Sequence, residues 1–519
     1  MRVWNQLREK YLSVDLRVLG VLRVGYGLVL LCDLVRRAQV LELFYSNDGV
    51  LSNHYVMFSP QDAFQFSLLD AFSTPAEVRV AFGLMALVYA LLTLGWHTRL
   101  AQVLALLALA SSNARNLFAE DDGVAALIAL GVWTLFLPLG ARYSLDALLQ
   151  EARLPHAAAR VRWRQRLLQT PFVSLAVLAA SLQLLAICWL SAAHQVGATW
   201  QSGEAVHYLL WQRRLVTGFG SWLAQHEPSW LSPLATYAAL GGAWALPVLA
   251  LAPIGRWPRV LALVLALALH AGSVAIVTHG PPSSALLLFV LLRCPASTLE
   301  ALFRRLPARV RRRWARRRGR AVRWLSRLRA LRQPTAISRR GPELQGAWTR
   351  HLREALVVVF LFVSLGDLGA RASASPLHLP RPRWARSLSG HLRFFQRWGA
   401  FAPDVPVEDG AGVIDALTQS GRHVDPFTGQ PPRFDALERS ALGGVAADYL
   451  FELQKDDNRR YRQELTRWLQ GWHEREGRTP DDRIARYELW WLSQPSPPPG
   501  STEPGAIRRA QVMRWSGEH

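Results

Sequence analysis

Repeated apolar runs of about twenty residues are the strongest constraint on how this 519-residue chain can fold. A run of that length can cross the ~30 Å hydrocarbon core of a bilayer. It must then be helical, because a lipid-facing backbone has to satisfy its own hydrogen bonds. We therefore predict an all-α polytopic membrane bundle of about nine transmembrane helices. The expected spans are residues 16–35, 78–95, 99–115, 123–140, 171–193, 233–253, 258–278, 284–303 and 354–370.

The net charge of +22 is concentrated in one segment. Sixteen arginines lie from Arg304 to Arg340, where no acidic residue occurs. If the N-terminus is cytoplasmic, alternation of the spans puts this block and most other basic residues of the loops between spans inside, as the positive-inside rule requires. The short outside loops hold only Arg36, Arg37, Arg213 and Arg214. An odd number of spans then makes the C-terminal domain extracytoplasmic. Attraction to the anionic headgroups of membrane lipids explains the arginine block, so we expect no nucleic-acid partner.

Composition divides the chain into five parts. We expect a transmembrane bundle over 1–300, an arginine-rich cytoplasmic loop over 301–353, a final transmembrane helix over 354–370, a small α+β extracytoplasmic domain over 371–493, and a proline-rich tail over 494–519. Within the domain, the pattern predicts an amphipathic helix over Arg383–Trp398, a hairpin turning near Ser420–Gly421, a helix over Asp457–His473 and a strand over Arg483–Leu492. The proline-rich PSPPPG segment is expected to close the folded part.

Polar side chains inside apolar spans are candidates for a functional site, because they are costly in the membrane and usually face a bundle interior. Arg23 lies near the middle of the first span and needs a partner. Gln183 and His194 are three helical turns apart and share one face if the helix continues. His194 would lie at the outer mouth of the bundle, either as an acid or base or as a hydrogen-bonded interfacial histidine. His270 is either a satisfied core histidine or a catalytic group.

An acidic cluster with Asp121 and Asp122 follows the third predicted span. Clustered carboxylates can share a proton or hold a metal, but the chain has no second oxygen-rich motif at ligand spacing, which favours an exposed acidic turn. The cysteines Cys32, Cys188 and Cys294 all fall in apolar segments and form no CxxC motif. We therefore expect no metal site and no disulfide framework.

Several of these stretches, in order along the chain, resemble the horizontally transferred transmembrane domain family, the bacterial relatives of vitamin K-dependent gamma-carboxylase. The matching stretches are the opening helix LRVLGVLRVGYGLVLLCDLVRR, the run from Asn116 to Gly123, PLGARYSLDALL with Asp146, TWQSGEA around Trp200, the helix with His270, and QRWGAFAPDVPVEDG followed by GRHVDPFTG. The resemblance implies a location in the bacterial inner membrane and, through the family, a reduced quinone as a candidate cofactor.

The characterised member of that family oxidises reduced vitamin K with O₂, and the strong base so formed lets a glutamate take up CO₂. Its essential lysine precedes the motif that matches Trp200, where this chain has His194 and Gln195. Its asparagine-histidine pair appears here as Asp121-Asp122. The only lysines, Lys10 and Lys455, are predicted to lie in the cytoplasm and far along the outer domain. A histidine, with an ordinary pKa near ~6.5, is a much weaker base than lysine.

Two functions from different classes follow. In the first, the chain is a non-carboxylating membrane protein that binds a lipid, a quinone or a partner, with a protein or peptide partner at the outer domain. In the second, it is a divergent membrane enzyme that acts on a reduced quinone, with His194 as its acid or base. The candidate binding residues for either function are Arg23, Asn116, Asp121, Asp122, Gln183, Gln195, Trp200 and His270. Transport is a weaker idea, because no pair of Gly/Pro-broken helices stands out.

Overall fold

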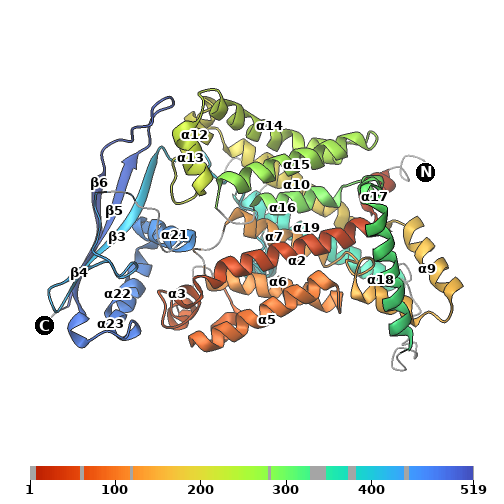
Figure 1. Cartoon of the computed structure of the whole chain (residues 1–519), viewed down its shortest axis with the longest axis horizontal. Coiled ribbons are helices and arrows are strands. Elements are labelled where there is room, and N and C mark those ends of the chain that lie inside the picture. The colour runs from red at the N-terminus through yellow and green to blue at the C-terminus, as the bar shows by residue number, and fades with distance from the viewer. Residues whose placement is uncertain are drawn as a thin grey trace.

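The computed structural model describes residues 7–58, 64–116, 118, 121–278, 282–327, 347–371, 381–435, 437 and 443–517. Most of these residues are helical, and a small antiparallel sheet lies toward the C-terminus. Figure 1 shows the sheet at one end of the long axis of the molecule, with the helical bundle in the middle and α17 (Ala296–Arg305) and α18 (Ala308–Arg327) at the other end.

Within the part of the chain that the structure describes, five helices are long and apolar enough to cross a membrane: α2 (Leu16–Ala38), α5 (Pro75–Leu94), α10 (Leu175–His194), α14 (Leu231–Leu251) and α15 (Trp257–Ile276). At a rise of ~1.5 Å per residue, twenty residues reach ~30 Å, the thickness of the hydrocarbon core. Each coincides with a predicted span to within a few residues. The helices are therefore compatible with a multi-pass membrane protein.

The predicted number of nine spans is not confirmed. The expected helix over 284–303 is two helices, α16 (Pro282–Leu292) and α17, which meet at an angle of 104°. The break falls at Pro295, because the residue before a proline is disfavoured in helical conformation. The helix α7 (Asp122–Thr134) has only 13 residues, and all of them after Asp122 are buried, so α7 is a core helix of the bundle. The other two predicted spans correspond to α6 (Thr98–Arg115) and α19 (Ala347–Arg371), which carry more polar residues than the five apolar helices.

The bundle is assembled around α2. The hydroxyl of Tyr26 donates to the carbonyl of Leu127 in α7 over 3.1 Å. Gly27 lets α5 approach closely, because a Cβ at this position would overlap the side chain of Thr93. Both residues lie on the buried side of α2. Small and hydrogen-bonded residues of this kind are typical of helix contacts within a membrane bundle.

The arginine-rich segment predicted as a loop over 301–353 is helical as far as Arg327. The helix α18 packs against α8 (Leu145–Arg153), where the fully buried carboxylate of Glu151 pairs with Arg318 of α18 and with Arg164 of α9 (Ala157–Gln169). Arginine has a good helix propensity, and a buried carboxylate offsets part of the charge repulsion. The remaining predicted loop, 328–346, lies outside the described residues.

The C-terminal sheet has the strand order β4-β3-β5-β6 and is antiparallel throughout. Its strands are β3 (Glu408–Thr418), β4 (His423–Val424), β5 (Ile484–Pro495) and β6 (Arg508–Ser516). The side chains of Ile414 and Ala416 alternate with more exposed neighbours and pack under α21 (Gly443–Gln454) and α22 (Arg462–Gln470). The structure thus has a small sheet region toward the C-terminus, and this region contains the predicted strand over 483–492 and the predicted hairpin, whose Gly421 has φ 81°.

Three predicted elements of this domain differ from the structure. The amphipathic helix over 383–398 ends early as α20 (Arg383–Leu392), because Arg393 adopts a left-handed conformation with φ 54°. The helix over 457–473 is divided into a 3-10 turn (Asp456–Tyr461), α22 and the short α23 (Trp472–Arg475). The folded part does not close at the proline-rich segment, because β6 follows it and pairs with β5. In the sequence of β6, exposed arginines, which are common on an edge strand, hide the alternation of apolar and polar residues that predicts a strand.

The domain is docked on the connection between α2 and α5. The carboxylate of Glu464 in α22 accepts from the backbone N–H and the hydroxyl of Ser52, over 3.2 and 2.8 Å. Arg467 donates to the carbonyl of Gly49 over 2.7 Å. The aromatic rings of Phe44 in α3 (Leu41–Tyr45) and Tyr449 in α21 meet edge to face. These contacts dock the sheet domain on the bundle.

Candidate functional site

Residues 394–405 cross the end of the bundle between α20 and β3, and we call this segment the strap. It contains no regular secondary structure, so its backbone groups need partners from elsewhere. Many of these partners are side chains that the sequence analysis selected as a candidate site. Gln183, His194, Gln195, Trp200 and Asp122 each make a hydrogen bond to the strap.

A buried amide network ties α10 to the strap. The Nε2 of Gln183 donates to the Oε1 of Gln396 over 2.7 Å, and the indole of Trp398 donates to the same oxygen over 3.0 Å. The backbone N–H of Gln396 donates to the carboxylate of Asp367 in α19 over 2.7 Å. Gln183 and Gln396 are each 3% exposed and Asp367 is 0% exposed, so solvent cannot substitute for these bonds. The network therefore fixes the strap against two helices.

His194 makes a different contact at the end of α10. Its Nδ1 lies 2.8 Å from the carbonyl oxygen of Trp398. Because a carbonyl can only accept, Nδ1 carries a proton and the neutral ring has its lone pair on Nε2. The side chain is exposed rather than enclosed in a cavity. His194 thus lies at the end of α10, and its hydrogen bond holds the strap in place.

The TWQSGEA stretch binds the second half of the strap. The indole of Trp200 donates to the carbonyl of Phe401 over 3.0 Å. The backbone N–H and the hydroxyl of Thr199 both donate to the carboxylate of Asp404 over 2.8 Å. The hydroxyl bond, more than the backbone bonds, holds the pKa of Asp404 below its usual range. A Cβ at Gly197 would overlap this carboxylate, so the close approach requires glycine.

The two aspartates at the start of α7, Asp121 and Asp122, have separate roles. The side chain of Asp121 caps α7 by accepting from the backbone N–H of Val124 over 2.8 Å. It also lies 3.7 Å from the guanidinium of Arg36. Asp122 accepts from the backbone N–H of Gly399 in the strap over 3.3 Å. Within the described residues, no group of three or more His, Cys, Asp or Glu side chains is arranged to hold a metal ion.

Three of the predicted site residues lie away from the strap. Arg23 donates to the carbonyl of Tyr143 over 2.6 Å, in the turn before α8 at the opposite end of the bundle. His270 pairs with the hydroxyl of Ser283 over 3.0 Å, between α15 and α16. Asn116 is fully buried and accepts from the backbone N–H of Phe118 over 3.1 Å. The structure does not bring these residues into one site with His194.

The functional residues that sequence reasoning missed are on the strap itself. Gln396, Trp398 and Asp404 all lie in the QRWGAFAPDV stretch, which carried the family resemblance but was not assigned to the site. The partner of Gln396, Asp367, is the only acidic residue near the end of the last predicted span, and this position in an apolar segment could have indicated a polar contact there.

Comparisons with protein-family models, with curated proteins and with solved structures found no match for this chain.

Proposed function

We propose that this chain is a non-carboxylating membrane protein of the horizontally transferred transmembrane domain family, and that it binds anionic membrane lipids. The observation that carries the first part is the contact of His194 with the strap. The position expected for the catalytic lysine holds a histidine whose Nδ1 is committed to the carbonyl of Trp398. The neighbouring Gln195 is also engaged, by the carbonyl of Ala400 over 3.0 Å. Both side chains therefore hold the strap on the end of α10.

The lipid-binding surface is formed by α17 and α18. Its apolar side chains are unusually exposed: Trp314 is 65% and Trp324 is 63% exposed, and Leu302 and Phe303 are about half exposed. Arginines alternate with them, and Arg312, Arg313, Arg316 and Arg317 are all exposed. An amphipathic helix of this kind lies in the membrane interface, and each basic residue near an anionic surface contributes ~1 kcal/mol.

Charge complementarity selects the lipid. No acidic residue lies between Glu300 and Glu343, so an anionic headgroup meets no competing carboxylate within the segment. With this surface on the cytoplasmic side of a bacterial inner membrane, the sheet domain at the other end of the bundle would be extracytoplasmic. The proposal thus links the charge pattern to a single orientation.

Native mass spectrometry of the purified full-length protein tests lipid binding. We expect phosphatidylglycerol to be retained in preference to phosphatidylcholine. Replacement of Arg312, Arg313, Arg316 and Arg317 by Gln should abolish that preference. The matched control is Arg508→Gln with Arg509→Gln, which removes exposed arginines of β6 at the opposite end. Equal retention of the two lipids, or an unchanged preference in the fourfold variant, would contradict the proposal.

A second candidate function is oxidation of a reduced quinone with His194 as the base. The observation that favours it is the tautomer of His194, because Nδ1–H bound to a carbonyl leaves Nε2 free to accept a proton. Purified protein would be given reduced naphthoquinone under air, and quinone epoxide would be measured by mass spectrometry. On our proposal we expect no epoxide above that of His194→Ala. Epoxide from the wild type alone would favour the enzyme.

A further inference from the structure

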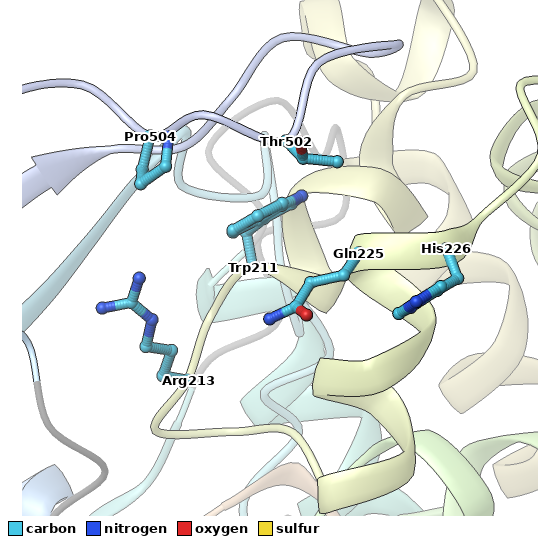
Figure 2. Close-up of a pocket in the computed structure, with 6 residues that line it drawn as sticks. All are labelled: Trp211, Arg213, Gln225, His226, Thr502 and Pro504. Carbon is cyan, nitrogen blue, oxygen red and sulfur yellow. The ribbon is translucent and has the colours of Figure 1, made fainter.

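A cleft lies where the bundle meets the C-terminal domain, and none of its described lining residues belongs to the strap or to the lipid-binding surface. Its volume is about 380 Å³, and its lining residues are Trp211, Arg213, Gln225, His226, Thr502 and Pro504. Figure 2 shows that Trp211, Arg213, Gln225 and His226 come from the segment around α12 (Ala205–Leu210) and α13 (Gly218–His226). Thr502 and Pro504 come from the connection between β5 and β6 and lie on the other side of the cleft in this view.

The lining of the cleft is rich in hydrogen-bond donors. It offers an indole N–H, a guanidinium, an amide, an imidazole and a hydroxyl, and no carboxylate is among the lining residues that the structure describes. Glu227, next to His226, is already paired with His207 and accepts from the hydroxyl of Ser232 over 2.5 Å. A ligand with acceptor atoms and negative charge would therefore meet complementary groups.

Trp211 supplies an independent indication of a ligand. Its side chain is only 8% exposed, and its Nε1 is buried without a hydrogen-bond partner among the described residues. A buried indole N–H usually finds a partner, and leaving a buried donor unpaired costs ~1–3 kcal/mol. Trp211 lines the cleft, and an acceptor atom of a ligand that reaches the buried Nε1 would satisfy this N–H.

Arg213 is held in position with donor capacity to spare. Its Nη1 donates to the carbonyl of Leu437 over 2.9 Å, and its Nε lies 4.0 Å from the carboxylate of Asp409. The carboxylate of Asp409 also accepts from the backbone N–H groups of Arg213 and Gly410, over 3.2 and 2.9 Å, so it is shared among several donors. The Nη2 of Arg213 makes no hydrogen bond with the described residues and can bind an anion.

The wall of the cleft that Thr502 and Pro504 form is preorganised by hydrogen bonds of the connection between β5 and β6. The Nε2 of His207 lies 2.8 Å from the carbonyl oxygen of Pro497. Gln494 donates to the carbonyl of Gly505 over 2.9 Å, and the backbone N–H of Gly505 donates to Pro495 over 2.9 Å. These contacts hold both ends of the proline-rich connection, so Thr502 and Pro504 keep their places without a ligand. Preorganisation lowers the entropy cost of binding.

We infer that this cleft binds a small organic carboxylate, with Arg213 and Trp211 as its principal contacts. One guanidinium among otherwise neutral donors fits a monoanion better than a phosphate dianion, and the Nη2 of Arg213 can make a charge-assisted hydrogen bond to a carboxylate. The volume lies near the lower end of the ~300–1,000 Å³ of small-molecule sites, which limits the ligand to a small molecule. The inference stands independently of lipid binding and of the role of His194.

Ligand-observed ¹⁹F NMR on the detergent-purified full chain tests this inference. Fluoroacetate is the probe, and fluoroacetamide is its neutral counterpart of nearly the same shape. We expect the wild type to broaden the fluoroacetate signal and to leave the fluoroacetamide signal unchanged. Arg213→Gln should weaken fluoroacetate binding at least tenfold. The control Arg508→Gln removes an exposed arginine of the same domain and should bind as the wild type does.

A second variant keeps the test decisive if Arg213→Gln does not fold. Trp211→Phe retains the apolar ring and removes only the N–H, so we expect binding to weaken several-fold in a folded protein. The inference is overturned if fluoroacetate and fluoroacetamide behave alike, or if both variants bind as the wild type does. It is also overturned if fluoroacetate does not bind to the wild type. Binding of inorganic phosphate alone would likewise overturn it.

Discussion

At the scale of single residues, His207 shows how one side chain can couple two parts of the molecule. Its Nδ1 contacts the carboxylate of Glu227 and its Nε2 contacts the carbonyl of Pro497. Both partners are acceptors, so only the doubly protonated imidazolium satisfies both contacts. Burial opposes this charge, but the bonds to Glu227 and Pro497 outweigh it and raise the pKa of His207 above its ordinary value.

The raised pKa predicts a pH dependence of stability. A raised folded-state pKa makes a stabilising contribution that is complete below the unfolded pKa of ~6.5 and is lost as pH rises through the folded value. The difference in thermal stability between wild type and His207→Gln should therefore be largest in mildly acidic buffer and shrink as pH rises. Thermal unfolding in detergent across pH measures it. A difference independent of pH would refute this role, and His226→Gln is the control.

Gly197 carries a second prediction at this scale. Because a Cβ here would overlap the carboxylate of Asp404, Gly197→Ala should lower the free energy of unfolding by ~1–3 kcal/mol. Gly241→Ala is the matched control, since nothing lies within 4 Å of a Cβ at that position. In the double variant with Asp404→Ala, the two losses should be clearly less than additive, because the clash is gone. Strict additivity would show that the two residues do not touch.

At the scale of elements, the amide network determines how α10 meets the strap. Gln396→Leu should destabilise the protein by ~1–3 kcal/mol, because it leaves the buried Nε2 of Gln183 and the indole N–H of Trp398 without their shared acceptor. Combining it with Gln183→Leu should cost less than the sum of the two single changes. Unfolding free energies of the four proteins of this cycle would measure the coupling, and a coupling of zero would exclude the network.

The docking of α18 on α8 depends on one buried carboxylate. Glu151→Gln removes the charge that pairs with Arg164 and Arg318, so α18 should separate from the bundle more often. We expect trypsin to cleave within 308–327 several-fold faster than in the wild type. Glu42→Gln, which breaks an exposed pair with Arg79 elsewhere, is the control. Unchanged cleavage would mean that other contacts hold α18.

At the scale of the whole molecule, the sheet domain and the arginine-rich helices lie at opposite ends of the bundle. Arg17 at the start of α2 pairs with Glu300 of α17, whereas Arg36 near its end lies close to Asp121 beside the strap. The 23 residues of α2 separate these ends by ~34 Å, more than the thickness of the hydrocarbon core. A membrane around the bundle would put the two regions on different sides.

Cysteine labelling measures this arrangement. In a variant whose native cysteines are replaced by serine, Ser420→Cys lies in the exposed turn of the hairpin and Ala315→Cys on the exposed face of α18. A membrane-impermeant maleimide should label position 420 in cells with a permeabilised outer membrane. Position 315 should react only after the inner membrane is also opened. Equal labelling of both positions in intact spheroplasts would contradict the orientation.

Sequence patterns predicted some parts of the chain more accurately than others. The five long apolar helices were predicted to within a few residues, and so was β5. The bend at Pro295 was missed because apolar character continues through it, and hydropathy does not register the local restriction that a proline imposes. The strand β6 was missed because its arginines hide the alternation. In the candidate site, Gln183 and His194 were selected, but their partners on the strap were not.

The sequence by itself determined that the long apolar segments of this chain are helical, because a run of twenty apolar residues can satisfy its backbone in a bilayer in only one way. It also determined which segment carries the positive charge. Only the tertiary structure decided which polar side chains meet. Gln183 and Gln396 are 213 positions apart, and residue spacing holds no information about contacts that depend on the packing of distant segments. The same holds for Arg23 and His270, which residue type grouped with His194 and packing separated.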